Sequence, residues 1–188
     1  MANKLTVALT RDQYEHLIEL MHRGSCEFRP NDRIAAALVL EANLGLRIED
    51  ILQLRMSDIV KDGDRYRLNL IEQKTQKKRT FTVPLPIYVY IERYCKDNSI
   101  DPDDVIFPIT ERGIQKYLAK VVDYAGYKNI GTHSFRKFFA TQIYIDNNYN
   151  IVLVQQLLQH SSAATTQRYI GITSKEMESA LLNHIDLL

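Results

Sequence analysis

The stretch GTHSFRKFFAT, residues 131–141, combines a helical core face with two polar groups of defined chemistry. Its phenylalanines recur at the spacing of one helix side, at Phe135, Phe138 and Phe139. His133 and Arg136 are three residues apart, which places both near one face of the same helix turn. An imidazole beside a guanidinium suits an anion-binding site. A helix that merely begins with a polar turn is the alternative.

The size and composition of the chain are those of an ordinary domain. Its 188 residues fit one domain. No apolar run approaches the roughly 20 residues of a membrane span, and the first residues lack the apolar stretch of a secretory signal. Cys26 and Cys95 form neither a CxxC motif nor a Cys/His cluster, so we expect no disulfide and no metal there. These features predict a soluble, intracellular protein.

The positive charge is gathered in clusters. The formal net charge is +1, so binding of nucleic acid would require basic residues to concentrate on one face. The first cluster consists of Lys74, Lys77, Lys78 and Arg79. The second consists of Arg112, Lys116, Lys120 and Lys128.

Helical spacing predicts most of the chain to be α-helical. Thr10 and Gln13 form a capping box for a first helix that ends at Gly24. A second helix ends near Gly45, and a short third helix follows in residues 47–54. Further helices are expected around residues 87–94, 114–122, 131–141 and 151–160, with a turn-rich connection at 97–110 and a small-residue segment at 161–172.

A small antiparallel sheet is expected among these helices, in residues 59–84. Asp62-Gly63 is a turn signal. Residues 65–70 and 79–83 alternate polar and apolar side chains, and the second run ends at Pro84. The pattern predicts an α+β fold, mostly α-helical, with lysines at the tip of a β-hairpin.

A last helix is predicted over residues 173–188. Thr173 and Glu176 form its cap. Its apolar stripe consists of Met177, Leu181, Ile185 and Leu188. This stripe either packs on the core of its own chain or docks on a neighbouring subunit.

Several common catalytic motifs are missing from the sequence. The GxxxxGK loop of nucleoside-triphosphate enzymes is absent, as is the GxSxG nucleophile elbow. The sequence also contains no HExxH motif, which disfavours a metal-dependent nuclease.

Four further polar residues are separated in sequence, and each has an ordinary structural explanation. Arg47 is consistent with a solvated residue past a helix end, and Lys74 with a lysine that protects a sheet edge. His160 would suit a helix C-terminus. Tyr169 is one of eleven tyrosines, which commonly bury the ring and leave the hydroxyl in water.

Taken together, these residues resemble the catalytic domain of the tyrosine recombinases, the phage-integrase family. The stretches that carry the resemblance are LGLRIEDILQLRMSDI (44–59), EQKTQKKRTFTVPL (72–85), THSFRKFFAT (132–141) and LLQHSSAATTQRYIGI (157–172). The resemblance extends from Leu9 to Leu188. It implies a catalytic set of Arg47, Lys74, His133, Arg136, His160 and the nucleophile Tyr169.

The chain departs from the family pattern at a few positions. Gln159 stands where many members have glycine, and little consequence is expected. Asp50 matches the acidic residue near the first arginine, with Glu49 as a competitor, while Lys77 and Lys78 compete with Lys74.

Most members also carry a separate helical domain before the catalytic domain. Only about nine residues precede the first predicted helix here. Residues 1–188 are therefore expected to form a single catalytic domain without that N-terminal domain. The chain is either an excised catalytic domain or a small stand-alone recombinase like the fimbrial phase-variation invertases.

The resemblance implies a site-specific DNA recombinase of the integrase or invertase type. Tyr169 would attack the phosphorus and form a 3′-phosphotyrosyl link, which conserves the bond energy without a nucleotide cofactor. Arg47 and Arg136 would bind the non-bridging oxygens, so no divalent ion is expected. Lys74 would protonate the leaving 5′-oxygen, and His133 would assist proton transfer.

His160 would donate a hydrogen bond to a non-bridging oxygen. Double-stranded DNA is the implied partner, bound by a tetramer in the cytoplasm at the nucleoid, without a small-molecule substrate or a membrane. Direct DNA contacts are expected from Lys77, Lys78, Arg79, Arg112, Gln115 and Lys116. A type IB topoisomerase, a non-catalytic DNA-binding module and a hydrolytic nuclease are the alternatives.

Overall fold

The computed structural model describes residues 6–74, 76, 78–160 and 162–171. Its chain divides into two compact units, residues 1–139 and residues 140–188, and each is described by itself. The predicted helix at 173–188 lies outside the described residues. Among the described residues, no helix is long and apolar enough to cross a membrane.

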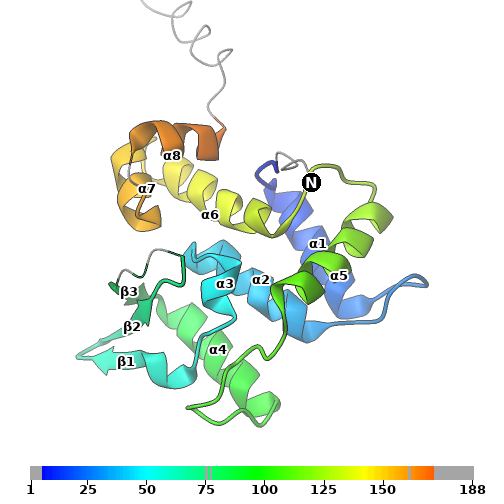
Figure 1. Cartoon of the computed structure of the whole chain (residues 1–188), viewed down its shortest axis with the longest axis horizontal. Coiled ribbons are helices and arrows are strands. Elements are labelled where there is room, and N and C mark those ends of the chain that lie inside the picture. Colours follow the sequence, from blue (N-terminus) through cyan, green and yellow to red (C-terminus); the bar gives the residue numbers. More distant parts are fainter. Residues whose placement is uncertain (1–5, 75, 77, 161, 172–188) are drawn as a thin grey trace, which may run out of the picture. The chain divides into compact units, whose positions relative to one another are not determined.

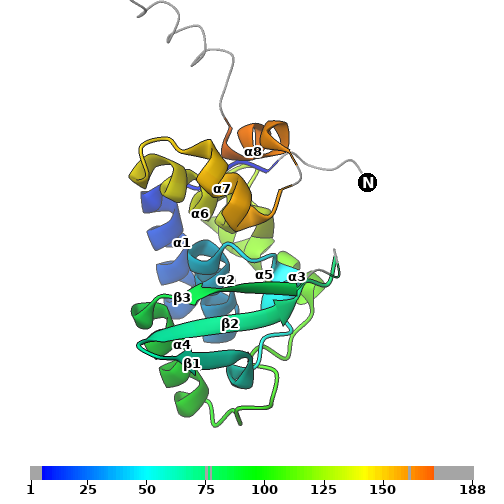
Figure 2. The same ribbon diagram turned by 90° about the vertical axis from the view of Figure 1, so that its left-hand side faces the viewer.

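The first unit consists of helices with a small sheet at one side of them (Figures 1 and 2). Its helices are α1 (Arg11–Arg23), α2 (Asp32–Leu44), α3 (Ile48–Ile51), the 3₁₀ helix η1 (Met56–Asp58), α4 (Leu85–Asp97), α5 (Glu111–Tyr124) and the first part of α6 (Thr132–Asp146). Its strands are β1 (Ile59–Asp62), β2 (Arg65–Ile71) and β3 (Lys78–Val83), which pair antiparallel in the order β1-β2-β3.

Helix α2 forms the centre of the first unit. It is apolar almost all round, and three consecutive alanines from Ala35 to Ala37 are at most 1% exposed. Small side chains let neighbouring helices approach closely, and α2 contacts α1, α3 and α4. Phe135 and Phe138 of α6 are buried against Tyr14 of α1, with the Tyr14 and Phe138 rings stacked at 4.9 Å. Phe135 and Phe138 thus form the expected core face, while Phe139 is half-buried.

The sheet covers α4 with one of its faces. Leu68 of β2 is opposite Ile59 on one side and Phe81 on the other, and it is fully buried. Helix α4 packs against β2. The three strands lie within residues 59–84, where the alternation of the sequence predicts them. Figure 2 shows the three strands side by side, in the order β1-β2-β3.

The local signals at the helix ends form as the sequence predicts. Thr10 and Gln13 make a reciprocal capping box at the start of α1. Gly45 ends α2 in the left-handed conformation, at φ +59°. Helix α3 is shorter than expected, because the residues after Ile51 form turns rather than a continued helix.

The second unit contains the remainder of α6, then α7 (Ile151–Leu158) and α8 (Ala163–Ile170). Helix α8 falls in the small-residue segment at 161–172, for which no helix was predicted. Its mixture of alanine and threonine gives no apolar period, but Ser162 caps it by accepting a hydrogen bond from the Thr165 amide, and Gly171 ends it at φ +81°. The cap residues therefore define a helix that periodicity alone does not reveal.

Candidate active site

Arg47 is held by a buried carboxylate. Its Nη1 donates to Glu72 Oε2 at 2.8 Å, and the side chain of Glu72 is only 1% exposed. The other carboxylate oxygen of Glu72 accepts a hydrogen bond from Arg79 Nη1 at 3.3 Å. Arg47 itself keeps 16% of its side chain exposed, so the guanidinium is fixed on one side and open on another.

Gly45 links Arg136 to the end of α2. Arg136 Nη1 donates a hydrogen bond to the carbonyl oxygen of Gly45, and Arg136 is 2% exposed. A Cβ at Gly45 would lie 2.3 Å from Cδ1 of Phe139, in addition to the strain of the positive φ. Only glycine therefore allows α6 to approach closely enough for this arginine to be held.

The surroundings of His133 shift the pKa of its imidazole. Its side chain is exposed, and partial desolvation together with the positive charges of Arg136 and Lys74 lowers its pKa, whereas Glu111 and Glu49 oppose the shift. The imidazole is therefore neutral at pH 7 and is able to accept a proton.

A pocket of about 350 Å³ brings three of the predicted catalytic residues together. Its lining consists of Arg47, Ile48, Glu49, Gln73, Lys74, Glu111 and His133. The guanidinium of Arg47, the ammonium group of Lys74 and the neutral imidazole of His133 line one hollow, and such groups suit the binding of a phosphate. Glu111 was not predicted from sequence, where it is simply the first residue of a helix. Gln115 donates to its carboxylate at 2.7 Å.

Asp50, rather than Glu49, fixes the hairpin. Asp50 is 3% exposed, and its Oδ1 accepts a hydrogen bond from the backbone N–H of Gln73 at 2.8 Å. Burial raises the pKa of Asp50, while the Gln73 amide and Arg47 oppose the shift. Glu49 is half-buried and lines the pocket instead.

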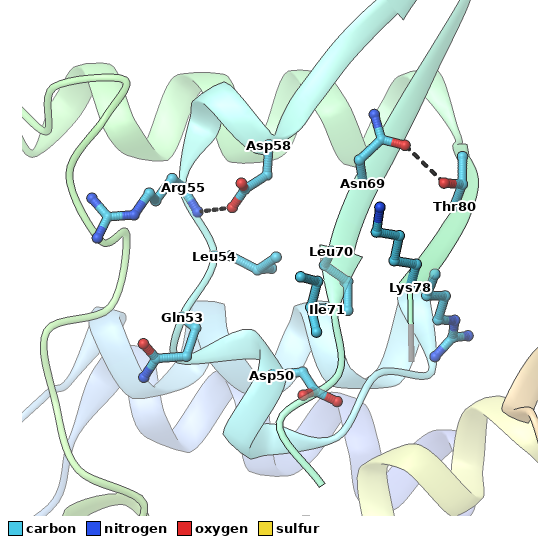
Figure 3. A pocket seen from close by; sticks show the side chains of 11 residues that line it. Asp50, Gln53, Leu54, Arg55, Asp58, Asn69, Leu70, Ile71, Lys78 and Thr80 are labelled. Carbon is cyan, nitrogen blue, oxygen red and sulfur yellow. Dashed lines mark hydrogen bonds between the residues drawn. The ribbon is translucent and has the colours of Figure 1, made fainter. Parts of the chain in front are cut away.

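A second hollow of about 580 Å³ is lined by side chains from residues 50–58 and from strands β2 and β3 (Figure 3). Asp50 is at one end, and the hydrogen-bonded side chains of Asn69 and Thr80 are at the other. Lys78 lies along β3 with an exposed side chain. Lys74 is also exposed, whereas Lys77 lies outside the described residues.

Arg79 differs from the expectation that it faces DNA. It is 4% exposed and paired with Glu72, and its guanidinium lies 4.8 Å from the ring centroid of Phe81. Burial lowers the pKa of Arg79 and the Glu72 carboxylate opposes this, so the group stays charged. The reason is the strand period: Arg79 shares its face of β3 with Phe81 and Val83.

The expected helical DNA-facing residues are on the surface. Arg112, Gln115 and Lys116 are exposed on α5, although the amide of Gln115 is engaged by Glu111.

The second unit brings His160 and Tyr169 together. Their rings meet edge to face, with centroids 5.1 Å apart and an interplanar angle of 76°. His160 Nδ1 lies 3.0 Å from Oγ1 of Thr166, which is fully buried. Thr166 therefore fixes the orientation of the imidazole. Gln155 adds a second contact, donating from Nε2 to the His160 carbonyl at 3.2 Å.

Comparison with protein families matches residues 8–176 to the phage integrase family. This chain belongs to the phage integrase family. The predicted family membership is confirmed, because the match covers most of the chain.

Relatives of this integrase-family chain are recombinases by name. Tyrosine recombinase XerA of Pyrococcus furiosus is 28% identical over 187 residues, covering 94% of this chain and 61% of the relative. The probable integrase/recombinase YoeC of Bacillus subtilis is 31% identical over 157 residues, covering 80% of this chain and 83% of the relative. The integrase-family chain thus spans less than two thirds of XerA but most of YoeC.

Solved structures confirm the predicted fold class. XerH recombinase bound to its palindromic difH substrate superposes with a TM-score of 0.69 at 22% identity, covering 95% of this chain and 53% of that one. The catalytic domain of bacteriophage HP1 integrase gives a TM-score of 0.61 at 19% identity, covering 95% of both chains. The integrase-family fold is therefore that of a recombinase catalytic domain.

Proposed function

We propose that this protein cleaves and rejoins double-stranded DNA at specific sites through a covalent 3′-phosphotyrosyl intermediate. The observation that carries the proposal is the pocket that brings Arg47, Lys74 and His133 together. Relatives named tyrosine recombinases support it, as does XerH, whose structure was solved on its DNA substrate.

The proposed reaction exchanges one phosphoester bond for another. The Tyr169 hydroxyl attacks the phosphorus, the bond to the 5′-oxygen breaks, and that oxygen takes a proton from Lys74. The neutral imidazole of His133 accepts the proton that the Tyr169 hydroxyl loses as it attacks. Religation runs the same steps in reverse, with the 5′-hydroxyl as the nucleophile.

Charge stabilisation comes from the guanidinium groups. Negative charge grows on the non-bridging oxygens in the transition state, and donors that are already in place stabilise it most effectively. Arg47 is fixed by Glu72, and Arg136 is fixed by the Gly45 carbonyl. His160, oriented by Thr166, adds a further donor in the proposed reaction.

Exposed basic residues are proposed to hold the DNA backbone. Lys78 of β3 and Arg112 and Lys116 of α5 are suited to phosphate contacts. Arg79 is left out of this set because it is buried. We further propose action at the nucleoid by a tetramer, with residues 173–188 docking between subunits.

Covalent trapping tests the proposed reaction. The protein is mixed, in the presence of a chelator, with nicked duplexes made from fragmented genomic DNA, and adducts that resist SDS are isolated. We expect an adduct that disappears in Tyr169→Phe and persists in the control Tyr149→Phe, an exposed tyrosine of the same unit. Sequencing of the attached ends then identifies the target site.

Three outcomes would contradict the proposal. Cleavage without an adduct would indicate a hydrolytic nuclease. An adduct in Tyr169→Phe would mean that another group is the nucleophile. Relaxation of supercoiled DNA without exchange between two sites would favour a type IB topoisomerase.

A further inference from the structure

We infer that Glu72 is a positioning residue, which sets the guanidinium of Arg47 and the hairpin of Lys74 in one common geometry. The inference rests on the proposed function. It concerns how the cleavage pocket is assembled rather than which groups touch the DNA.

Each carboxylate oxygen of Glu72 binds a different arginine. Oε2 accepts from Arg47 Nη1 at 2.8 Å, and Oε1 accepts from Arg79 Nη1 at 3.3 Å. The carboxylate and Arg79 are buried, with side chains 1% and 4% exposed. The partially exposed member is Arg47, which is also the member that lines the pocket.

The three residues come from three places in the fold. Glu72 directly follows β2, Arg79 is the second residue of β3, and Arg47 immediately precedes α3. One carboxylate therefore joins both strands of the hairpin to the start of this helix. The next residue, Gln73, is bound through its backbone N–H to Asp50. Lys74 follows directly, so its backbone departs from two anchored residues.

The ion pair with Glu72 restricts the side chain of Arg47 but leaves some of its N–H donors open. A long arginine side chain has many rotamers, and a fixed partner selects among them. A guanidinium has several N–H donors, so the contact from Nη1 leaves others for the oxygens of a phosphate. A buried carboxylate that bound only Arg47 would cancel its charge.

Arg79 supplies a second positive charge beside Glu72, so that the charge of Arg47 is not cancelled. Two guanidiniums around one carboxylate leave one positive charge in excess, so Arg47 is oriented while the group as a whole still attracts an anion. This explains why a basic residue of the hairpin is buried instead of exposed. A purely structural ion pair would not need a residue of the pocket as one of its members, whereas this one includes Arg47.

The test separates positioning from folding. Glu72→Gln keeps the shape but removes the charge, and Glu72→Asp keeps the charge but shortens the reach. Glu27→Gln, an exposed glutamate of the same unit, is the matched control. Each variant is checked for its folded state by circular dichroism. Its dissociation constant for nicked duplex is then measured, together with its single-turnover cleavage rate on saturating DNA.

We expect Glu72→Gln to cleave at least about 30-fold more slowly at saturation, because the loss lies in the transition state rather than in binding. Glu72→Asp is expected to recover part of that rate. A substrate with sulfur in place of the 5′-bridging oxygen needs no protonation of its leaving group. It should therefore restore part of the Glu72→Gln rate, namely the part that is lost through misplacement of Lys74.

Other results would overturn the inference. A folded Glu72→Gln protein that cleaves at the wild-type rate would make Glu72 purely structural, and one that cleaves faster would make it a restraint on Arg47. If Glu72→Gln fails to fold, Glu72→Asp decides in the same way: a wild-type rate refutes positioning. A wild-type protein that forms no adduct would refute the proposed function, and the inference with it.

Discussion

Glu41 is a buried carboxyl of α2 within electrostatic reach of Arg136. It is fully buried, and the backbone of Ile48 offers its carboxyl group only a weak hydrogen bond. Burial raises its pKa well above the ordinary value, and the nearby Glu111 adds to the shift, whereas the charge of Arg136 opposes it. We conclude that Glu41 holds a proton under conditions in which an exposed glutamate has lost it.

This predicts a pH-dependent cost in stability. Above the ordinary glutamate pKa the unfolded chain has released the proton that the native state keeps, so unfolding becomes more favourable as pH rises. We expect Glu41→Met to raise the free energy of unfolding at pH 8 by about 1–3 kcal/mol. The gain should shrink as pH falls toward 4.5. Urea unfolding between pH 5 and pH 8.5 measures it.

Glu27→Met, which changes an exposed glutamate, is the control and should show no such trend. If Glu41→Met were less stable than the wild type at pH 8, the carboxylate would be ionised and paired productively with Arg136.

At the scale of elements, the helix ends carry much of the site. Gly45 ends α2 and supplies the carbonyl that holds Arg136, while the start of α3 positions Arg47. The end of α7 has a less favourable backbone conformation than the end of α2, because its cap residue is not glycine. Gln159 has φ +54°, in the left-handed region that glycine adopts without strain. The family's frequent glycine at this position thus has a conformational reason, and the expectation of little consequence for Gln159 stays a prediction.

Gln159→Gly is therefore expected to stabilise the protein by about 1 kcal/mol, because it relieves the left-handed strain of a side chain. Thermal or urea unfolding measures the change. Gln156→Gly is the matched control, since it introduces the same residue at an exposed position inside α7. That control should lose about 1 kcal/mol. Destabilisation by both substitutions would show that the Gln159 side chain contributes more than its backbone costs.

At the scale of the whole molecule, the net positive charge is small, and the basic residues are gathered in local clusters. The net charge is +1, so the proposed DNA binding depends on local groups such as Lys116 and Arg112 on α5. Each phosphate contact releases a counterion from the duplex, which makes the affinity depend on salt.

Lys116→Ala is expected to weaken DNA binding at low salt and to reduce the slope of log K against log salt by about 0.9. Fluorescence anisotropy measures this slope in titrations at salt concentrations from about 50 to about 200 mM, where the affinity for DNA falls steeply. Lys96→Ala, on α4 and outside both basic clusters, should leave it unchanged. An unchanged slope for Lys116→Ala would remove this residue from the interface.

The amino-acid sequence is enough to predict most of the helices, apart from α8, together with the sheet, the family and the candidate catalytic residues. These depend on caps, periods of 3.6 and 2.0, and motifs whose members are near neighbours along the chain. Even the burial of Arg79 was within reach, because the alternation of β3 places it with Phe81 and Val83.

Only the tertiary structure decided what those residues touch. Arg47 and Glu72 are 25 residues apart, and Arg136 and the Gly45 carbonyl are 91 apart. No local pattern encodes such pairs. Whether a charged side chain is solvated or buried depends on the elements that pack around it, and burial decides both its pKa and its partner. For that reason Glu41, Glu72, Glu111 and Thr166 emerge only from the folded chain.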